Sequence, residues 1–270
     1  EEQGLASLAA LCASAPAIVE KLVSAEAGVH ARVLAEVAQA AIEALRRDMA
    51  SWSLGFETLR TLSRSKLERA WADPRAAQAD FGQDVAIGAR LHRVQRLRAK
   101  AKFEKWLVSE ASVDAPLVAF GSEGVGKTWA VLDWLHDGHL SETILLTVPS
   151  SALPALGAIT ELSVKRFIAD RLYELAGRRD PAHWLVRLDL LLRRPPEEGP
   201  VVTLFLDGIN QEPSAPWLAL LKALQGPAFA GRVLVIVTTR TLHFRDKLAN
   251  LSGLVVPVSQ AEIDAYDLEP

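Results

Sequence analysis

The chain has 270 residues, half of them hydrophobic, and a formal net charge of −3 at pH 7. This length accommodates one α/β domain of ordinary size and a smaller element. The single cysteine, Cys12, excludes a disulfide framework, and the near balance of charge argues against a nucleic-acid partner. No apolar run approaches the roughly 20 residues of a membrane span. We therefore expect a cytoplasmic protein without nucleic-acid or membrane partners.

Residues 1–84 form the first predicted region, which is helical almost throughout. Ala, Leu, Glu and Arg dominate it, and apolar residues recur at spacings of three and four. The clearest helices are predicted at 20–49 and 56–71, and the second ends before Asp73-Pro74 because a residue before proline disfavours helix. No catalytic constellation appears here. A helical scaffold is the favoured interpretation, and an effector or an oligomerisation module is the alternative.

A third helical region is predicted over 85–108 and begins the second domain, 85–270. Its cations are spread around the helix, with apolar residues between them, whereas a nucleic-acid-binding helix gathers its cations on one face. A solvated helix face is therefore the favoured interpretation. The cations of this region are Arg90, Arg93, Arg96, Arg98, Lys100, Lys102 and Lys105.

The stretch 116–128 joins a short apolar run, a glycine-rich turn and the start of an apolar helical pattern. Its G-x4-G-K-T pattern between strand and helix is typical of a phosphate-binding loop. Glycines let backbone N–H groups converge on an anion, and the helix N-terminus adds the positive end of its dipole. We expect Lys127 to contact the β- and γ-phosphates and Thr128 to bind Mg²⁺. The predicted nucleotide-contacting residues are Gly121, Ser122, Glu123, Gly124, Val125, Gly126, Lys127, Thr128 and Trp129.

After this loop, apolar runs and helical patterns alternate, which is typical of a parallel sheet covered by helices. Strands are predicted at 143–148, 201–206, 232–239 and 254–258, and helices at 162–175, 181–192 and 217–224. Asp180-Pro181 supplies an N-cap and a first helical residue. Ser259-Gln-Ala-Glu262 has the pattern of a capping box and predicts one more helix.

Polar residues follow two of the buried strands. Asp207 ends the run 201–206, where a carboxylate can hold a nucleotide's metal through water, although an Asp that merely opens a turn fits the following Gly208 as well. Arg240 follows Thr238 and Thr239 at the end of the next strand. Because parallel strands share one carboxyl edge, Arg240 is predicted near the γ-phosphate. A pair between Arg240 and a nearby carboxylate such as Asp207 is the alternative.

Three motifs carry a resemblance to a known family: Gly-Ser-Glu-Gly-Val-Gly-Lys-Thr at 121–128, Leu-Phe-Leu-Asp-Gly-Ile-Asn-Gln at 204–211 and Val-Ile-Val-Thr-Thr-Arg at 235–240. Together they resemble the nucleotide-binding domain of STAND ATPases, which include NACHT, NB-ARC and bacterial antiviral proteins. The segment Leu-Val-Val-Pro-Val-Ser-Gln-Ala-Glu at 254–262 is similar to the start of the family's helical and winged-helix parts. The resemblance covers about 85–270.

The resemblance implies a P-loop NTPase with the strand order 5-1-4-3-2, ATP and Mg²⁺. Lys127 and Thr128 would hold phosphate and magnesium, Asp207 the second metal contact and Arg240 the γ-phosphate. It also implies a switch that forms homo-oligomers when a C-terminal part senses a protein ligand, so that N-terminal effectors meet. We expect that sensing part to be cut away after residue 270. Antiphage defence or cell-death signalling is the implied setting.

One departure from the family pattern concerns hydrolysis. The family commonly has two acids where this chain has Asn210 and Gln211, and an amide cannot accept a proton from an attacking water. Glu212, displaced by one residue, is the predicted substitute. We therefore expect a protein that binds ATP and hydrolyses it slowly. The alternatives are a mechanical ATPase of the AAA+ kind with continuous hydrolysis and, less favoured, a small-molecule kinase.

Overall fold

A computed structural model describes residues 17, 36–37, 39–40, 55–81, 96–109, 115–149, 158–249 and 259–263. The chain divides into two compact units, Glu1–Thr58 and Leu59–Pro270. The described residues 17, 36, 37, 39 and 40 of the first unit are helical, and most of the predicted helix 20–49 lies outside the described residues. The expected domain boundary after residue 84 does not coincide with the division after Thr58.

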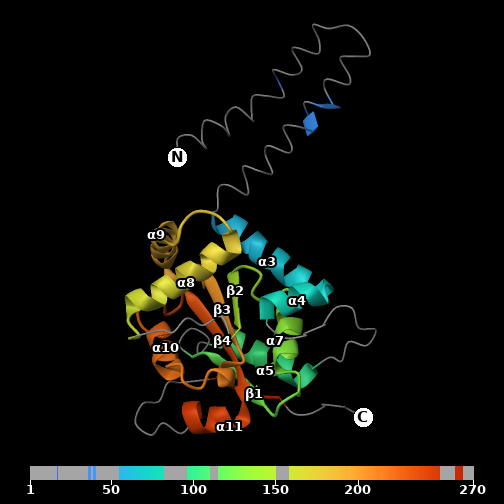
Figure 1. Cartoon of the computed structure of the whole chain (residues 1–270), viewed down its shortest axis with the longest axis vertical. Helices are drawn as coiled ribbons and strands as arrows, with labels where there is room; N and C mark the ends of the chain where they lie inside the picture. Colours follow the sequence, from blue (N-terminus) through green and yellow to red (C-terminus); the bar gives the residue numbers. More distant parts are fainter. Residues whose placement is uncertain are drawn as a thin grey trace. The chain divides into compact units, whose positions relative to one another are not determined.

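The second unit is built on a five-stranded parallel sheet (Figure 1). Its strands lie in the order β2-β3-β4-β1-β5. The predicted α/β fold with an all-parallel, five-stranded sheet is confirmed. Near-continuous apolar runs form β1 to β4, because both faces of the sheet are covered. The strands are β1 Leu117–Gly121, β2 Ile144–Pro149, β3 Val202–Asp207, β4 Val233–Arg240 and β5 Ser259–Glu262.

Helices lie on both sides of this sheet, with α3, α4 and α7 on one side and α8, α9 and α10 on the other (Figure 1). The helices are α3 Phe56–Ala72, α4 Pro74–Phe81, α5 Leu97–Leu107, α7 Lys127–His136, α8 Glu161–Ala176, α9 Pro181–Leu192, α10 Trp217–Leu224 and α11 Thr241–His243. Further helical turns occur at Pro196–Glu198, Ile209–Gln211 and Phe244–Ala249. Asp180 accepts a hydrogen bond from the backbone N–H of His183 at 2.7 Å, so the predicted start of α9 is confirmed.

The hydrophobic core on the α7 side joins helices from before and after the glycine-rich loop 121–126. Leu67 of α3, Phe103 of α5 and Trp134 of α7 share it with Ile236 of β4. The buried residues of α3 recur every three or four positions, which places them on one helix face. The helix predicted at 56–71 is thus confirmed, and it packs with the α/β unit.

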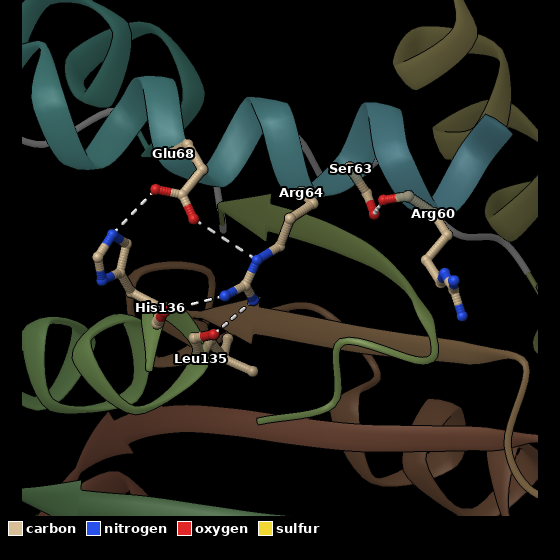
Figure 2. Close-up of polar contacts among 6 residues, drawn as sticks. All are labelled: Arg60, Ser63, Arg64, Glu68, Leu135 and His136. Atoms are coloured by element: carbon tan, nitrogen blue, oxygen red, sulfur yellow. Dashed lines mark hydrogen bonds and ion pairs between the residues drawn. The ribbon is translucent and has the colours of Figure 1, made fainter. Parts of the chain in front are cut away.

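Polar contacts attach α3 to the end of α7 (Figure 2). Arg64 donates hydrogen bonds to the carbonyl oxygens of Leu135 and His136, at 2.7 and 2.9 Å. Glu68 lies 3.0 Å from Nε2 of His136 and 3.5 Å from Nε of Arg64. These contacts connect a helix of the region before residue 84 to the helix that follows the phosphate loop.

Two sequence-based expectations are wrong. Residues Ser259–Glu262 form strand β5 and not the start of a helix, because their backbone pairs with β1 from Leu117 to Phe120. The backbone N–H of Ile263 also donates to the carbonyl oxygen of Phe120 at 2.8 Å. Such pairing satisfies more backbone groups than a capping box does. The strand predicted at 254–258 lies outside the described residues.

The solvated face predicted for 85–108 is also wrong for two of its cations. Arg96 and Lys100 are buried. Lys100 forms ion pairs with Asp133 at 2.6 Å and Asp137 at 2.5 Å, both on α7. A buried cation needs such partners. Residues 85–95 lie outside the described residues.

No helix among the described residues is long and apolar enough to cross a membrane.

Candidate functional site

The predicted phosphate loop connects the end of β1 to the first turn of α7. Gly126 is the N-cap of α7 and has a φ of +80°, a left-handed conformation that favours glycine. A side chain at Gly121 would place its Cβ 2.4 Å from the carbonyl oxygen of Ile263, so that only glycine fits beside β5. The loop thus turns sharply and leads directly into α7, a helix of ten residues. The first backbone N–H groups of a helix lack intrahelical partners.

Asp207, the last residue of β3, contacts the first turn of α7. Its Oδ1 accepts hydrogen bonds from the hydroxyl groups of Thr128, at 2.6 Å, and Thr238, at 2.5 Å. The hydroxyl of Thr238 in turn accepts from the backbone N–H of Gly208 at 2.8 Å. The three side chains come from β3, β4 and α7, so this network ties the phosphate loop to the carboxyl edge of the sheet.

The second oxygen of Asp207 has no hydrogen-bond partner, although Asp207 is only 2% exposed. Burial raises the pKa of this carboxyl, and the hydrogen bonds from Thr128 and Thr238 and the charge of Lys127 oppose that rise. A buried carboxylate oxygen without a donor fits a cation or a metal-bound water. Thr128 and Asp207 therefore suit the predicted Mg²⁺, whose site in proteins uses few protein ligands, with water and phosphate oxygens as the others.

Lys127 is folded back over its own loop. Its Nζ donates to the carbonyl oxygens of Ser122, at 2.7 Å, and Gly121, at 3.2 Å. Burial lowers the pKa of Lys127, the nearby charge of Arg240 lowers it further, and Asp207 and Glu123 oppose the shift. An anion beside Nζ would raise the pKa of Lys127 again, because it would stabilise the charged form of the ammonium.

Arg240 lies at the same edge, since it pairs in register with Gly121 at the end of β1. Its backbone N–H donates to Oδ1 of Asn210 at 3.1 Å. Its guanidinium contacts Oε1 of Glu123 at 2.5 Å. The guanidinium of Arg240 thus pairs with a carboxylate of the predicted phosphate loop, Glu123. Asp207 has Thr128 and Thr238 as its partners.

An open pocket of about 230 Å³ lies over this network. Its lining residues are Glu123, Gly124, Gly126, Lys127, Thr128, Trp129, Gly208, Asn210, Gln211, Thr238 and Arg240. Six of the nine predicted nucleotide-contacting residues are among them. The other three, Gly121, Ser122 and Val125, belong to the loop but do not line the pocket. Glu212, the predicted substitute base, is exposed outside the pocket.

Sequence reasoning missed the role of Arg96. Its Nη2 donates to the carbonyl oxygen of Val125 at 2.6 Å, and the residue is 7% exposed. Arg96, the N-cap residue of α5, therefore stabilises the position of the loop. The sequence contained only a weak hint, because Arg96 is one of many cations in a helical segment and its partner is 29 residues away.

No protein-family model matches this chain, and no curated protein matches it either. Among the described residues, no three His, Cys, Asp or Glu side chains gather to hold a metal by themselves. The described pocket instead offers the cations Lys127 and Arg240 and the start of a helix, and the buried carboxylate of Asp207 holds the lining hydroxyls of Thr128 and Thr238 from behind. This arrangement suits a phosphate group together with a hydrated divalent cation.

Proposed function

We propose that this chain binds ATP with Mg²⁺ at the carboxyl edge of its sheet and works as a nucleotide-dependent switch. The observation that carries the proposal is the 2.6 Å hydrogen bond between Thr128 and Asp207, with the second oxygen of Asp207 left without a donor. The hydroxyl and the carboxylate come from different elements and meet where a phosphate-bound cation would lie. Bound magnesium would neutralise phosphate charge there.

The pocket suits the phosphates better than a whole nucleotide. Its volume of about 230 Å³ is below the roughly 300–1,000 Å³ of sites that enclose a drug-sized ligand. Lys127 and Arg240 supply its cations, and the helix dipole of α7 adds to them. The nucleoside part would extend beyond the pocket, past Trp129 or past the loop.

The STAND resemblance gives the switch its proposed form. Read from β5, the sheet order is β5-β1-β4-β3-β2, as the resemblance implies, and the three motifs converge on one edge. In this proposal ATP-bound protomers assemble into a homo-oligomer that controls an effector, in antiphage defence or cell-death signalling. Such a switch needs only a difference in nucleotide affinity between two states.

The amide side chains that follow Asp207 in the sequence favour this switch over a mechanical ATPase. The amide side chains of Asn210 and Gln211 line the pocket, and Glu212 is not among its lining residues. An amide cannot act as a general base. Turnover of ATP with Mg²⁺ should therefore be slow, and rapid turnover that Glu212→Ala abolishes would instead support the mechanical ATPase.

Calorimetric titration of the chain with ATP, with and without Mg²⁺, tests the proposal. Lys127→Ala should weaken binding by roughly 2–5 kcal/mol, because a phosphate would lose its charged partner. Lys222→Ala, on the exposed surface of α10, is the matched control and should bind like the unmodified chain. Absence of heat from the unmodified chain, or normal affinity in Lys127→Ala, would overturn the assignment.

A further inference from the structure

Both cations of the pocket are held by one short segment of the phosphate loop, 121–123. The ammonium group of Lys127 donates to the carbonyl oxygens of Gly121 and Ser122. The guanidinium of Arg240 contacts the carboxylate of Glu123 at 2.5 Å. The loop therefore occupies the cationic groups that an anion would need.

The acceptor groups with which this segment holds the two cations differ in charge. Backbone carbonyls are neutral dipoles, so a charged phosphate would attract Lys127 more strongly than they do. Glu123 carries a full negative charge beside a site proposed for an anion. It repels phosphate oxygens as long as it is ionised, and it competes with them for the same guanidinium.

The backbone of Arg240 is fixed in the sheet, whereas its side chain forms an exposed ion pair. Strand pairing with Gly121 and the hydrogen bond from its N–H to Asn210 hold the main chain at the end of β4. The side chains of Arg240 and Glu123 are 47% and 75% exposed, and an exposed ion pair contributes only about 0–1 kcal/mol. The guanidinium can therefore change partners by side-chain rotation alone, at a small cost.

We propose that Glu123 is a specificity-determining residue that competes with the terminal phosphate of a nucleoside triphosphate for Arg240. This inference rests on the proposed function, because it takes the ligand to be a nucleotide. With a diphosphate bound, the pair between Glu123 and Arg240 persists. With a triphosphate bound, Arg240 leaves Glu123 for the γ-phosphate. The cost of breaking the pair falls on the triphosphate alone, so Glu123 lowers the preference for ATP over ADP.

Glu123→Gln tests this competition, with the dissociation constants of ATP and ADP as the readout. The variant should bind ATP more tightly by roughly two- to fivefold, the worth of an exposed ion pair. Its gain for ADP should be smaller, because ADP leaves the pair intact. Glu198→Gln is the matched control, since Glu198 forms a comparable exposed pair with Arg194 outside the pocket. It should leave both constants unchanged.

A double-mutant cycle separates competition from general repulsion of phosphate. In an Arg240→Gln background, Glu123→Gln should no longer change the ratio of the ATP and ADP constants, because the contested guanidinium is absent. An unchanged ratio in Glu123→Gln alone, or an equal change in both backgrounds, would overturn the inference. Loss of hydrolysis in Glu123→Gln with unaltered affinities would overturn it as well, since Glu123 would then act as a base.

The same titrations distinguish this inference from the proposed function. If the unmodified chain binds neither nucleotide, the proposed function fails. If it binds both and Glu123→Gln leaves the ATP to ADP ratio unchanged, the competition alone fails and nucleotide binding stands.

Discussion

The guanidinium of Arg64 on α3 lies 2.7 Å from the carbonyl oxygen of Leu135, in the last turn of α7 (Figure 2). The last carbonyls of a helix have no intrahelical partner, and they carry the negative end of its dipole. A cation from α3 thus holds one end of a helix whose other end carries Lys127 and Thr128. Helix α3 is therefore part of the framework that positions the phosphate loop.

Arg64→Met should lower the free energy of unfolding by about 1–3 kcal/mol, because hydrogen bonds from a charged donor are lost while the aliphatic stem is kept. Urea denaturation measures the change. Arg166→Met makes the same substitution at an exposed position of α8 and should stay within about 0.5 kcal/mol of the unmodified chain. Equal effects of the two substitutions would contradict a supporting role for α3.

Asp207→Asn should change how stability depends on pH in the absence of nucleotide. Burial raises the folded-state pKa of this carboxyl above its ordinary value of 3.8, so the neutral form is favoured in the folded state. The contribution of the Asp207 carboxyl to the free energy of unfolding is complete below pH 3.8, and it is lost as the pH rises through the folded-state pKa. The stability of Asp207→Asn relative to the unmodified chain should therefore increase with pH over this window.

Thermal unfolding from pH 3.5 to pH 8 gives the comparison for Asp207→Asn. Asp180→Asn replaces an exposed N-cap carboxylate of α9 and should not show the same increase. A constant difference between Asp207→Asn and the unmodified chain across the whole range would mean that the buried carboxyl does not titrate abnormally.

Thr128→Val should weaken magnesium-dependent binding of ATP. The substitution removes the hydroxyl that joins Asp207 and that would contact the cation. Loss of a group that orients or holds a metal typically costs roughly 10- to 100-fold in affinity. The affinity for ATP is measured once with Mg²⁺ and once with a chelator. Thr128→Val should weaken binding only in the presence of Mg²⁺. Thr128→Ser keeps the hydroxyl and should retain binding. Equal loss in both buffers would argue against a metal role.

Local sequence signals predicted the elements whose ends are set by neighbouring residues. Helix α9 starts after Asp180 because that side chain accepts a hydrogen bond from the backbone N–H of His183, three positions later. Both residues belong to one short stretch of sequence, so the pattern could be recognised there. Helix α3 ends before Asp73, which the following proline enforces. Alternation of apolar runs and helical patterns likewise predicted a parallel sheet, since no other arrangement covers both faces of such strands.

Contacts between distant residues could not be predicted in this way. Ser259–Glu262 carries a local capping pattern, but its backbone pairs with β1, more than a hundred residues earlier in the chain. The partner of Arg240 is Glu123, 117 residues away. The shared strand edge predicted that Arg240 would lie close to the loop. Which acceptor it would meet there depends on loop geometry, which the spacing of residues does not encode.

Trp129 should report on ligand binding by fluorescence. It lines the pocket, and its ring centroid lies 6.3 Å from that of Trp71 on α3. A ligand in the pocket would change the polarity around the Trp129 indole, so addition of ATP with Mg²⁺ should alter tryptophan emission. The change should be lost in Trp129→Phe and kept in Trp184→Phe, which alters a buried residue of α9 outside the pocket lining. A change that survives Trp129→Phe would place the ligand elsewhere.

Gly121→Ala should destabilise the edge of the sheet beside the loop. An added Cβ would lie 2.4 Å from the carbonyl oxygen of Ile263, a backbone atom that cannot move without shifting β5. Overpacking of this kind costs about 1–3 kcal/mol. At Gly55 an added Cβ meets nothing within 4 Å, so Gly55→Ala is the control and should not destabilise the chain. Hydrogen exchange at the amide of Ile263, which donates to the carbonyl oxygen of Phe120, should become faster in Gly121→Ala alone. Unchanged exchange and unchanged stability would mean that β5 does not lie against the start of the phosphate loop.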